Sequence, residues 1–259
     1  MLDNIDMDVE NQDTAIQTPN SQKRSLHTQI QCPPELQQPP FYKLKSNFLL
    51  KLLPSRGWAK ASPAPLHMSK CAQMPDQSCY VIGGAKDQQQ QDTVNTVTLH
   101  QIKQGRVETR EVKGMLQSRS CFGLTVDVTN KRIFVAGGQT SGVTTNRCEV
   151  YFCQEDRWQA LPALNEDRGA SSMTLLGGRW LYCVGGYKAN PSNGDSQLLN
   201  TIECLDLSRV QDGWSLLQNT LPQLICDVGL CPLSMNEAMI FGGWVKPQTV
   251  QFCYILRRL

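Results

Sequence analysis

The fold is decided by the stretch from Lys131 to Arg168, KRIFVAGGQTSGVTTNRCEVYFCQEDRWQALPALNEDR. An apolar run ends in the pair Gly137-Gly138, and a polar loop separates it from a second apolar run at Cys148–Cys153. A short turn then leads to a tryptophan, a Leu-Pro pair and the closing arginine. Short apolar runs that are bounded by glycines or polar turns are typical of β-strands. The stretch therefore predicts three consecutive strands.

The same pattern of an apolar run and a glycine pair occurs four times along the chain. The four copies are YVIGG at Tyr80–Gly84, FVAGG at Phe134–Gly138, YCVGG at Tyr182–Gly186 and MIFGG at Met239–Gly243. Successive glycine pairs are 54, 48 and 57 residues apart. A fixed period of this length indicates a repeat architecture in which each repeat is one structural unit.

From about residue 58 to 259 the chain resembles the kelch-repeat β-propellers. The resemblance depends on an ordered set of features: apolar strand, glycine pair, loop, strand, tryptophan, Leu-Pro and arginine. It implies an all-β propeller whose four-stranded blades bury their faces against their neighbours. The residues to which it gives a structural role are Trp58, Gly83, Gly84, Gly137, Gly138, Tyr151, Trp158, Gly185, Gly186, Trp214, Gly242 and Gly243.

The chain divides into a polar tail and a repeat region. Residues 1–40 are rich in Gln, Asn, Asp, Ser and Pro, a composition that predicts disorder. The propeller is expected over 41–259, as a half blade at 41–66 and blades at about 67–119, 120–168, 169–225 and 226–259. In the half blade, Phe48–Leu53 is expected as the third strand and Trp58–Ser62 as the fourth. In the first full blade, Val107 stands near the place of the tryptophan.

Closure of the ring has two solutions. The Trp58 strand could supply the missing fourth strand of the last blade, which would close a ring of about four blades. Alternatively the propeller is incomplete, and its open edges would favour self-association because they present unpaired backbone groups.

Composition excludes several classes of function. With 25 Lys and Arg against 23 Asp and Glu, the net charge of +2 predicts neither nucleic-acid nor membrane binding. The N-terminal sequence is acidic and polar where a signal peptide would be basic and apolar, so an intracellular, cytoplasmic protein is expected. Most of the 11 cysteines lie in expected strands as buried thiols. No spacing resembles a zinc site, so neither a metal nor a cofactor is expected.

The repeat resemblance implies a non-catalytic protein-interaction module, which could act as a scaffold or a substrate-recognition subunit. A link to ubiquitin ligases could come only through another subunit, because there is no room for BTB or BACK helices before the repeats. The binding face would consist of the loops Ala85–Asp92, Gln139–Asn146, Tyr187–Asn200 and Trp244–Thr249, with Gln117–Ser120 and Asn165–Gly169 beside them. The candidate contacts to an unidentified protein partner are Arg119, Gln139, Asn146, Arg168, Tyr187, Asn190, Asp195 and Trp244.

Two alternatives stay open at this stage. Arg119 and Arg168 could bind an acidic partner, or they could brace turns inside the propeller. The whole domain could also be a degenerate propeller enzyme that acts on a sugar or another small molecule. Its acid and base groups would be Glu166, Asp167 and Arg168, or Asp195 with Arg119, although their spacing specifies no reaction.

Overall fold

The structure is a computed structural model. It describes residues 41–43, 48–53, 57–63, 66–103, 106–189, 195–245, 248–249 and 252–258. The chain divides into two compact units, one that spans Val9–Ala64 and one that contains residues 65–259. In the part that the structure describes, 3-10 helix is confined to Val210–Asp212 and every other regular element is a β-strand.

The N-terminal unit contains one antiparallel sheet of three strands. These are β1 (Phe41–Lys43), β2 (Phe48–Leu53) and β3 (Gly57–Pro63), in the order β1-β2-β3. Strands are thus present where the sequence suggests the third and fourth strands of a half blade. They form a sheet of their own, and their assignment to a half blade stays a prediction.

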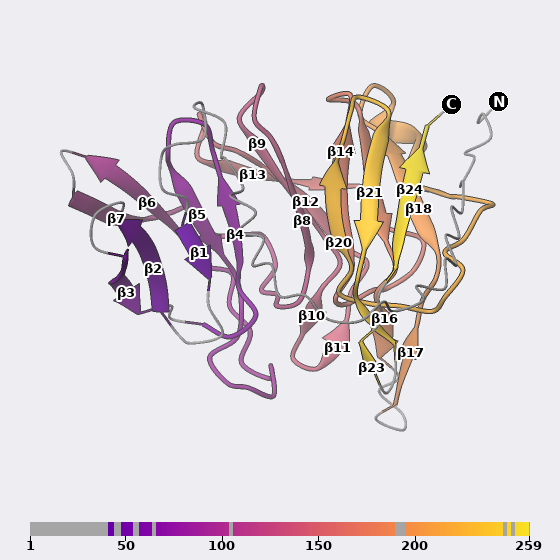
Figure 1. Cartoon of the computed structure of the whole chain (residues 1–259), viewed down its shortest axis with the longest axis horizontal. Coiled ribbons are helices and arrows are strands. Elements are labelled where there is room, and N and C mark those ends of the chain that lie inside the picture. The colour runs from indigo at the N-terminus through magenta and orange to yellow at the C-terminus, as the bar shows by residue number, and fades with distance from the viewer. Residues whose placement is uncertain are drawn as a thin grey trace, which may run out of the picture. The chain divides into compact units, whose positions relative to one another are not determined.

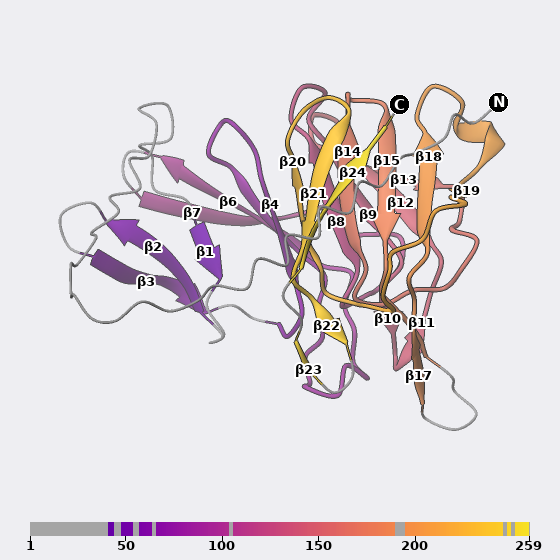
Figure 2. The same cartoon turned by 45° about the vertical axis from the view of Figure 1, so that its right-hand side comes forward.

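The second unit consists of four antiparallel sheets, which we call blades 1 to 4 (Figures 1 and 2). Blade 1 is β4 (Lys70–Gln73), β5 (Cys79–Ile82), β6 (Val97–Lys103) and β7 (Arg106–Val112). Blade 2 is β8 (Gly123–Asp127), β9 (Arg132–Ala136), β12 (Cys148–Phe152) and β13 (Arg157–Leu161). Blade 3 is β14 (Ser172–Leu176), β15 (Trp180–Val184), β18 (Ile202–Asp206) and β19 (Ser215–Leu216). Blade 4 is β20 (Gly229–Pro232), β21 (Glu237–Phe241) and β24 (Cys253–Arg257).

Each interior blade buries both of its faces. In β9, Ile133 and Val135 pack toward blade 1, whereas Phe134 and Ala136 pack toward blade 3. Successive side chains of a strand point to opposite faces, so a sheet between two neighbours needs an uninterrupted apolar run. The apolar run that precedes each of the four glycine pairs thus reflects the stacking of one blade on the next. The prediction of an all-β kelch-type propeller is confirmed.

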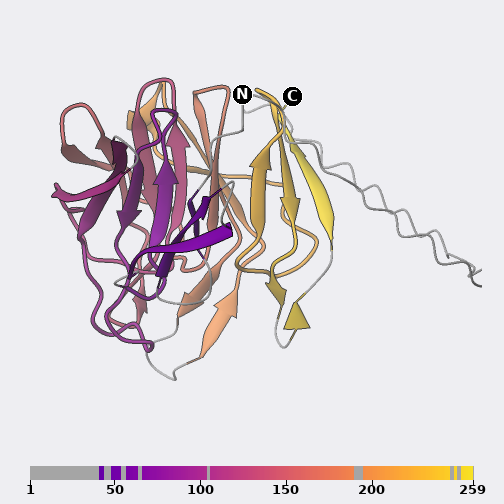
Figure 3. The same cartoon turned by 60° about the vertical axis from the view of Figure 1, so that its left-hand side comes forward.

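A chain of backbone hydrogen bonds joins the blades beside their innermost strands. The amide of Cys121 donates to the carbonyl of Met68 (3.4 Å), Ala170 donates to Cys121 (2.7 Å), and Asp227 donates to Ala170 (2.9 Å). All four residues have positive φ, between 49° and 54°. Among the described residues no such bond joins Met68 to Asp227. Figure 3 turns the last blade, drawn in gold and yellow, to one side of the others.

Two details of the strands differ from the sequence expectations. In blade 1 the residue opposite His100 is Thr109, the position that Trp158 holds opposite Tyr151 in blade 2. The tryptophan position of blade 1 is therefore Thr109 and not Val107, and the Thr109 hydroxyl lies 2.9 Å from Nδ1 of His100. Blade 4 has three strands in the part that the structure describes.

The glycine pair is required by a close backbone approach. Gly137 has a φ of +63°, and a Cβ on it would lie 2.3 Å from the carbonyl oxygen of Arg168. Gly178 has nearly the same φ, +66°, but nothing lies within 4 Å of its Cβ position. Two residues with one conformation thus differ only in the space around them.

We expect Gly137→Ala to destabilise the protein more than Gly178→Ala. The control should lose about 1–2 kcal/mol for its left-handed backbone. Gly137→Ala should lose more, because the Arg168 carbonyl must also move. Urea unfolding of both variants measures the difference, and equal losses would show that the close approach to the carbonyl has no energetic weight.

Candidate interaction face

The loops that follow the glycine pairs gather at one end of the blades (Figures 1 and 2). Three of them form short hairpins, namely β10–β11 (Gln139–Thr140 and Val143–Thr144), β16–β17 (Tyr187–Ala189 and Ser196–Leu198) and β22–β23 (Trp244–Val245 and Gln248–Thr249). In blade 1 the equivalent loop is Ala85–Asp92. We call this end of the molecule the hairpin face.

Each of these loops is fixed by the linker that enters its own blade. Ser120 forms an isolated antiparallel bridge with Gln139, Gly169 with Tyr187, and Cys226 with Trp244. In blade 1, His67 pairs with Ala85 in the same way. The start of every hairpin is therefore part of the scaffold, and only its tip is free to vary.

Neighbouring hairpins are also bonded to one another. The Tyr187 hydroxyl donates to Oε1 of Gln139 (2.5 Å), and the amide of Ala189 donates to Oγ1 of Thr144 (3.1 Å). Burial raises the pKa of Tyr187, so this phenol stays a protonated donor at neutral pH. The hairpin face is thus a connected layer, in which Gln139 and Tyr187 serve mainly to join blade 2 to blade 3.

The exposed parts of the hairpin face are mixed in polarity. Val143 is 47% exposed at the tip of β10–β11, and Lys188 is exposed on β16. Lys86 and Asp92 form an exposed ion pair of 3.1 Å on the first loop. Charges of both signs lie beside an apolar tip, which resembles the composition of an ordinary protein interface and not that of a phosphate-binding surface.

The remaining predicted contact residues are distributed unevenly. Trp244 is partly buried at the start of β22, and Asp195 is exposed beside β17, whereas Asn190 lies outside the described residues. Asn146 donates from its side-chain amide to the carbonyl of Leu164 (3.1 Å), within its own blade. The sequence analysis overlooked that Asn95 and Asn200 do the same toward Met115 (2.8 Å) and Leu221 (3.2 Å). Asn146 is thus one of three equivalent turn braces.

Arg119 is fully buried and joins blade 1 to blade 2. Its Nη1 donates to the carbonyls of Gly137 and Arg147 (2.7 Å each), and its Nη2 forms an ion pair with Glu149. Its own carbonyl accepts the amide of Gly84 in blade 1 (2.8 Å). Burial lowers the pKa of the Arg119 guanidinium, and the nearby Glu149 carboxylate opposes this shift.

Arg168 makes the same connection between blades 2 and 3. Its carbonyl accepts the amide of Gly138 (2.8 Å), and its Nη2 donates to Glu203 (2.7 Å), with both side chains 0% exposed. Neither arginine can reach an acidic partner, because each donates to acceptors inside the protein. Of the two roles considered for them, the structure gives them the bracing of the propeller.

A blade that lacks the glutamate of this ion pair also lacks the arginine. Strand register places Thr98 and Tyr254 at the positions that Glu149 and Glu203 hold in their blades. Ile225 stands where the linkers into blades 2 and 3 carry arginine, and it packs in one cluster with Tyr254. The signal in the sequence that could have identified the bracing role is the coupled presence of an arginine and a glutamate 30 or 35 residues later.

Trp158 of β13 and Trp214, which directly precedes β19, also connect successive blades. Nε1 of Trp158 donates to the carbonyl of Lys113 in blade 1 (2.8 Å), and Nε1 of Trp214 donates to Pro162 in blade 2 (2.9 Å). The Trp158 ring lies 5.0 Å from that of Tyr151, whose hydroxyl donates to Asp156 (2.6 Å). This hydrogen bond lowers the pKa of Asp156, and burial raises that of Tyr151.

No group of three or more His, Cys, Asp or Glu residues in the described part of the chain could hold a metal ion. The described cysteines are free thiols, and burial raises the pKa of Cys148 to about 12. No helix that the structure describes is long and apolar enough to cross a membrane. Of the predicted catalytic groups, Glu166 and Arg168 form an ion pair of 3.1 Å, in which the Arg168 side chain is buried and the Glu166 side chain is 34% exposed.

Comparison with known proteins agrees with this geometry. A family model described as Kelch motif matches residues 120–165, which are blade 2. Kelch-like protein 40 of Mus musculus is 36% identical over 109 residues, 42% of this chain and 16% of the relative. Kelch-like protein 40 of Xenopus laevis is 28% identical over 149 residues, 57% of this chain and 23% of the relative. The chain is a kelch-repeat protein.

Two further findings limit what these similarities show about the whole protein. The kelch-repeat chain spans 16% to 23% of the length of these two relatives. A solved structure of YjhT superposes with a TM-score of 0.66 at 11% identity, over 84% of this chain and 76% of YjhT. At that identity the likeness shows the fold alone.

Removing one partner of a buried ion pair should lower the free energy of unfolding more than replacing both partners. Arg168→Met leaves the Glu203 carboxylate buried without its cation, and we expect it to lose about 3–5 kcal/mol. The double variant Arg168→Ile with Glu203→Tyr copies the natural Ile225–Tyr254 arrangement and should lose less than the sum of its single variants. Urea unfolding measures both.

The matched control is the exposed pair Lys103–Glu108, whose side chains are 58% and 59% exposed. Lys103→Met should change the free energy of unfolding by less than about 1 kcal/mol. Additive losses in the Arg168/Glu203 cycle would contradict a coupled pair.

Asp156 should contribute to stability in a pH-dependent manner. Its folded-state pKa is lowered by the Tyr151 hydroxyl, so its contribution is complete above the pKa of the unfolded chain and is lost as the pH falls through the folded-state pKa. The stability difference between wild type and Asp156→Asn should therefore shrink between neutral pH and acid. Urea unfolding as a function of pH tests this, and a difference that stays constant would exclude the Asp156 carboxylate as its source.

Proposed function

We propose that this kelch-repeat chain is a non-catalytic protein-interaction module that binds a protein partner through the hairpin face. The observation that carries the proposal is the construction of this face. The hairpin starts are bonded to the scaffold, and those of blades 2 and 3 are bonded to each other, whereas Val143 beside the β10–β11 turn and Lys188 on β16 are exposed. A rigid layer with variable tips suits recognition of a folded partner surface.

The enzyme alternative has less support. The carboxylates nearest to the predicted catalytic arginines are Glu149 and Glu203, which are 2% and 0% exposed. A general acid or base must reach substrate, and these two carboxylates face arginines between blades. The predicted acid Glu166 is partly exposed, but its carboxylate accepts hydrogen bonds from Arg168 (3.1 Å) and from the hydroxyl of Thr201 (2.5 Å). The exposed acids Asp92 and Asp195 lie on separate hairpin-face loops, of blades 1 and 3 respectively. The names of the kelch-like relatives are also consistent with an interaction module.

The test changes two exposed hairpin residues in the full chain. We expect Val143→Arg with Lys188→Glu to reduce the recovery of specific partner proteins at least about tenfold in quantitative affinity purification, since central interface residues dominate binding. The melting temperature should be unchanged, because both side chains are exposed. Wild-type chain from the same cells is the reference.

The matched control carries the same kinds of substitution at the opposite end of the blades, Lys131→Glu with Leu233→Arg, both at exposed turn residues. The control should retain every partner that the hairpin variant loses. If the hairpin variant loses no partner, or if both variants lose the same ones, the hairpin face is not the binding site.

A further inference from the structure

The blade 1 loop of the hairpin face, Ala85–Asp92, is closed by hydrogen bonds of its own. The Asp87 carboxylate accepts the backbone amides of Gln91 (3.0 Å) and Asp92 (2.6 Å). These hydrogen bonds lower the pKa of Asp87, so the carboxylate is ionised at neutral pH. The amide of Lys86 also donates to the carbonyl of Asp92 (2.9 Å). The loop therefore keeps its shape through contacts within blade 1.

One side chain of this loop nevertheless reaches blade 2. Oε1 of Gln90 accepts the hydroxyl of Ser120 (2.7 Å) and the thiol of Cys121 (3.1 Å). Ser120 is fully buried, and Cys121 is partly buried. Two neighbouring donors of the linker into blade 2 thus converge on one carboxamide oxygen.

The backbone of Gln90 is in an unfavourable conformation. Its φ is 60°, in the left-handed region that residues with a side chain rarely adopt. Such a conformation persists only where surrounding contacts compensate for it. The two hydrogen bonds to the linker provide this compensation. A glutamine on another chain could make the same two bonds without a left-handed backbone, so the Gln90 contact is one that a partner can replace.

The next two linkers have other side chains at these two positions. They are Gly169 and Ala170 before blade 3, and Cys226 and Asp227 before blade 4. At the first of these linkers the ring of Tyr187 takes the space, because a Cβ on Gly169 would lie 2.9 Å from its Cζ. Of the three linkers, the one into blade 2 therefore carries a hydroxyl beside a thiol.

The surroundings of Ser120 favour an uncharged acceptor. The guanidinium of the neighbouring Arg119 is already paired with Glu149. A carboxylate bound at Ser120 would lose solvation without gaining that cation, and burying an unpaired charge is costly. A carboxamide oxygen loses less, which agrees with the group that the chain itself places there.

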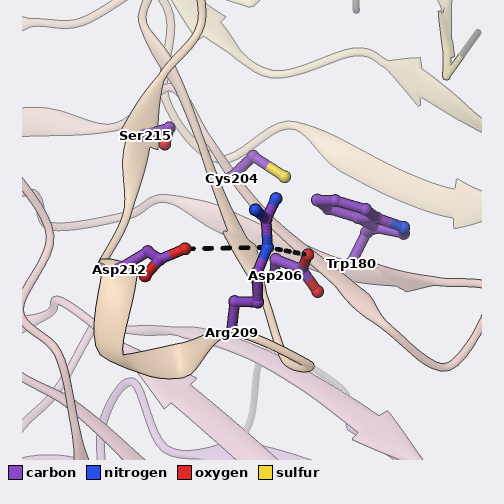
Figure 4. Close-up of a pocket in the computed structure, with 7 residues that line it drawn as sticks. Trp180, Cys204, Asp206, Arg209, Asp212 and Ser215 are labelled. Carbon is purple, nitrogen blue, oxygen red and sulfur yellow. Dashed lines mark hydrogen bonds and ion pairs between the residues drawn. The ribbon is translucent and has the colours of Figure 1, made fainter. Parts of the chain in front are cut away.

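The pocket on blade 3, of about 230 Å³, is by contrast filled with its own charges (Figure 4). Arg209 lies between Asp206 (3.4 Å) and Asp212 (3.7 Å). The Asp206 carboxylate also accepts two hydrogen bonds from Arg179 (2.7 and 2.6 Å). Because these charged groups pair within one blade, the pocket does not indicate the chemistry of a ligand.

We propose that Ser120 and Cys121 form a subsite of the hairpin face that binds the side-chain amide of a partner glutamine, and that Gln90 is an exchangeable internal ligand of this subsite. In the free chain Gln90 covers the subsite. When a partner binds, its glutamine takes the two hydrogen bonds and Gln90 turns to solvent. The subsite belongs to the hairpin face, so its role in partner binding rests on the function proposed above.

The thiol of Cys121 reports on the subsite, because a cysteine reacts as an accessible thiolate, whereas Gln90 covers the sulfur and accepts its proton. We expect Gln90→Ala to raise the rate at which iodoacetamide alkylates Cys121 at least about fivefold, the factor that loss of one net hydrogen bond gives. Quantitative mass spectrometry of the full chain measures the rate at each cysteine.

The matched control is Gln88→Ala, because Gln88 is an exposed glutamine of the same loop. It should leave the Cys121 rate unchanged. The exposed thiols Cys231 and Cys253 should react equally in all three proteins, and thermal melting checks that both variants are folded. Equal Cys121 rates in wild type and Gln90→Ala would overturn the proposal, since Gln90 would then not cover the subsite.

A peptide added to Gln90→Ala tests the ligand class. The probe has the sequence of residues 85–93, AKDQQQQDT. We expect it to slow alkylation of Cys121 in a saturable manner. The peptide AKDAAAADT should not do so, and AKDEEEEDT should do so more weakly. The proposal is overturned if the glutamine peptide does not protect Cys121. It is also overturned if the alanine peptide protects equally, since main-chain carbonyls would then suffice, or if the glutamate peptide does, since charge would then not matter.

These measurements use no partner protein, so they are independent of the test of the hairpin face. If they fail while the variant at Val143 and Lys188 loses its partners, the hairpin face binds partners without this subsite. If they succeed while that variant keeps its partners, Ser120 and Cys121 bind glutamine but the function proposed for the hairpin face is wrong.

Discussion

The structure depends on one hydrogen bond, which recurs between the second glycine of a blade and the linker that leaves the blade. Gly84 donates to Arg119, Gly138 to Arg168 and Gly186 to Ile225, each at 2.8 Å. The first glycine of each of these three pairs has positive φ and lies so close to the same carbonyl that no Cβ fits. The linker is thereby pinned to the blade that it leaves, and its side chain points into the blade that it enters.

The side chain that a linker inserts into the next blade differs from one linker to another. Two linkers insert an arginine that meets a buried glutamate, and one inserts Ile225 beside Tyr254. A buried ion pair gains little net stability over an apolar pair of similar volume, because both charges must be desolvated. The arginines also satisfy backbone carbonyls of the blade that they enter, such as Gly137 and Gly185. Their distinctive contribution is therefore directional, since only one placement of the neighbouring blade meets all of these acceptors.

The sequence was sufficient to predict the features that arise locally. The glycine pairs and apolar runs predict the strands because backbone conformation and strand alternation are short-range properties. It was insufficient for the roles of Arg119 and Asn146, because their acceptors come from distant turns and strands. The tryptophan position of blade 1 was misplaced for a similar reason, since only strand register identifies Thr109 as the residue opposite His100. The exposure of side chains on the hairpin face could likewise not be predicted, because it depends on which of them form hydrogen bonds across blades.

An uncovered strand edge is a liability in any β-protein, and the edge of blade 4 carries features that limit it. The strand β24 is short, and its last residue Arg257 forms an ion pair with Glu237. Arg258 follows and lies over Trp180. Charged groups at an edge discourage indiscriminate pairing of strands, because a partner strand must supply compensating charge or lose solvation. The charged side chains at the end of β24 therefore restrict which extended segment can pair with this edge.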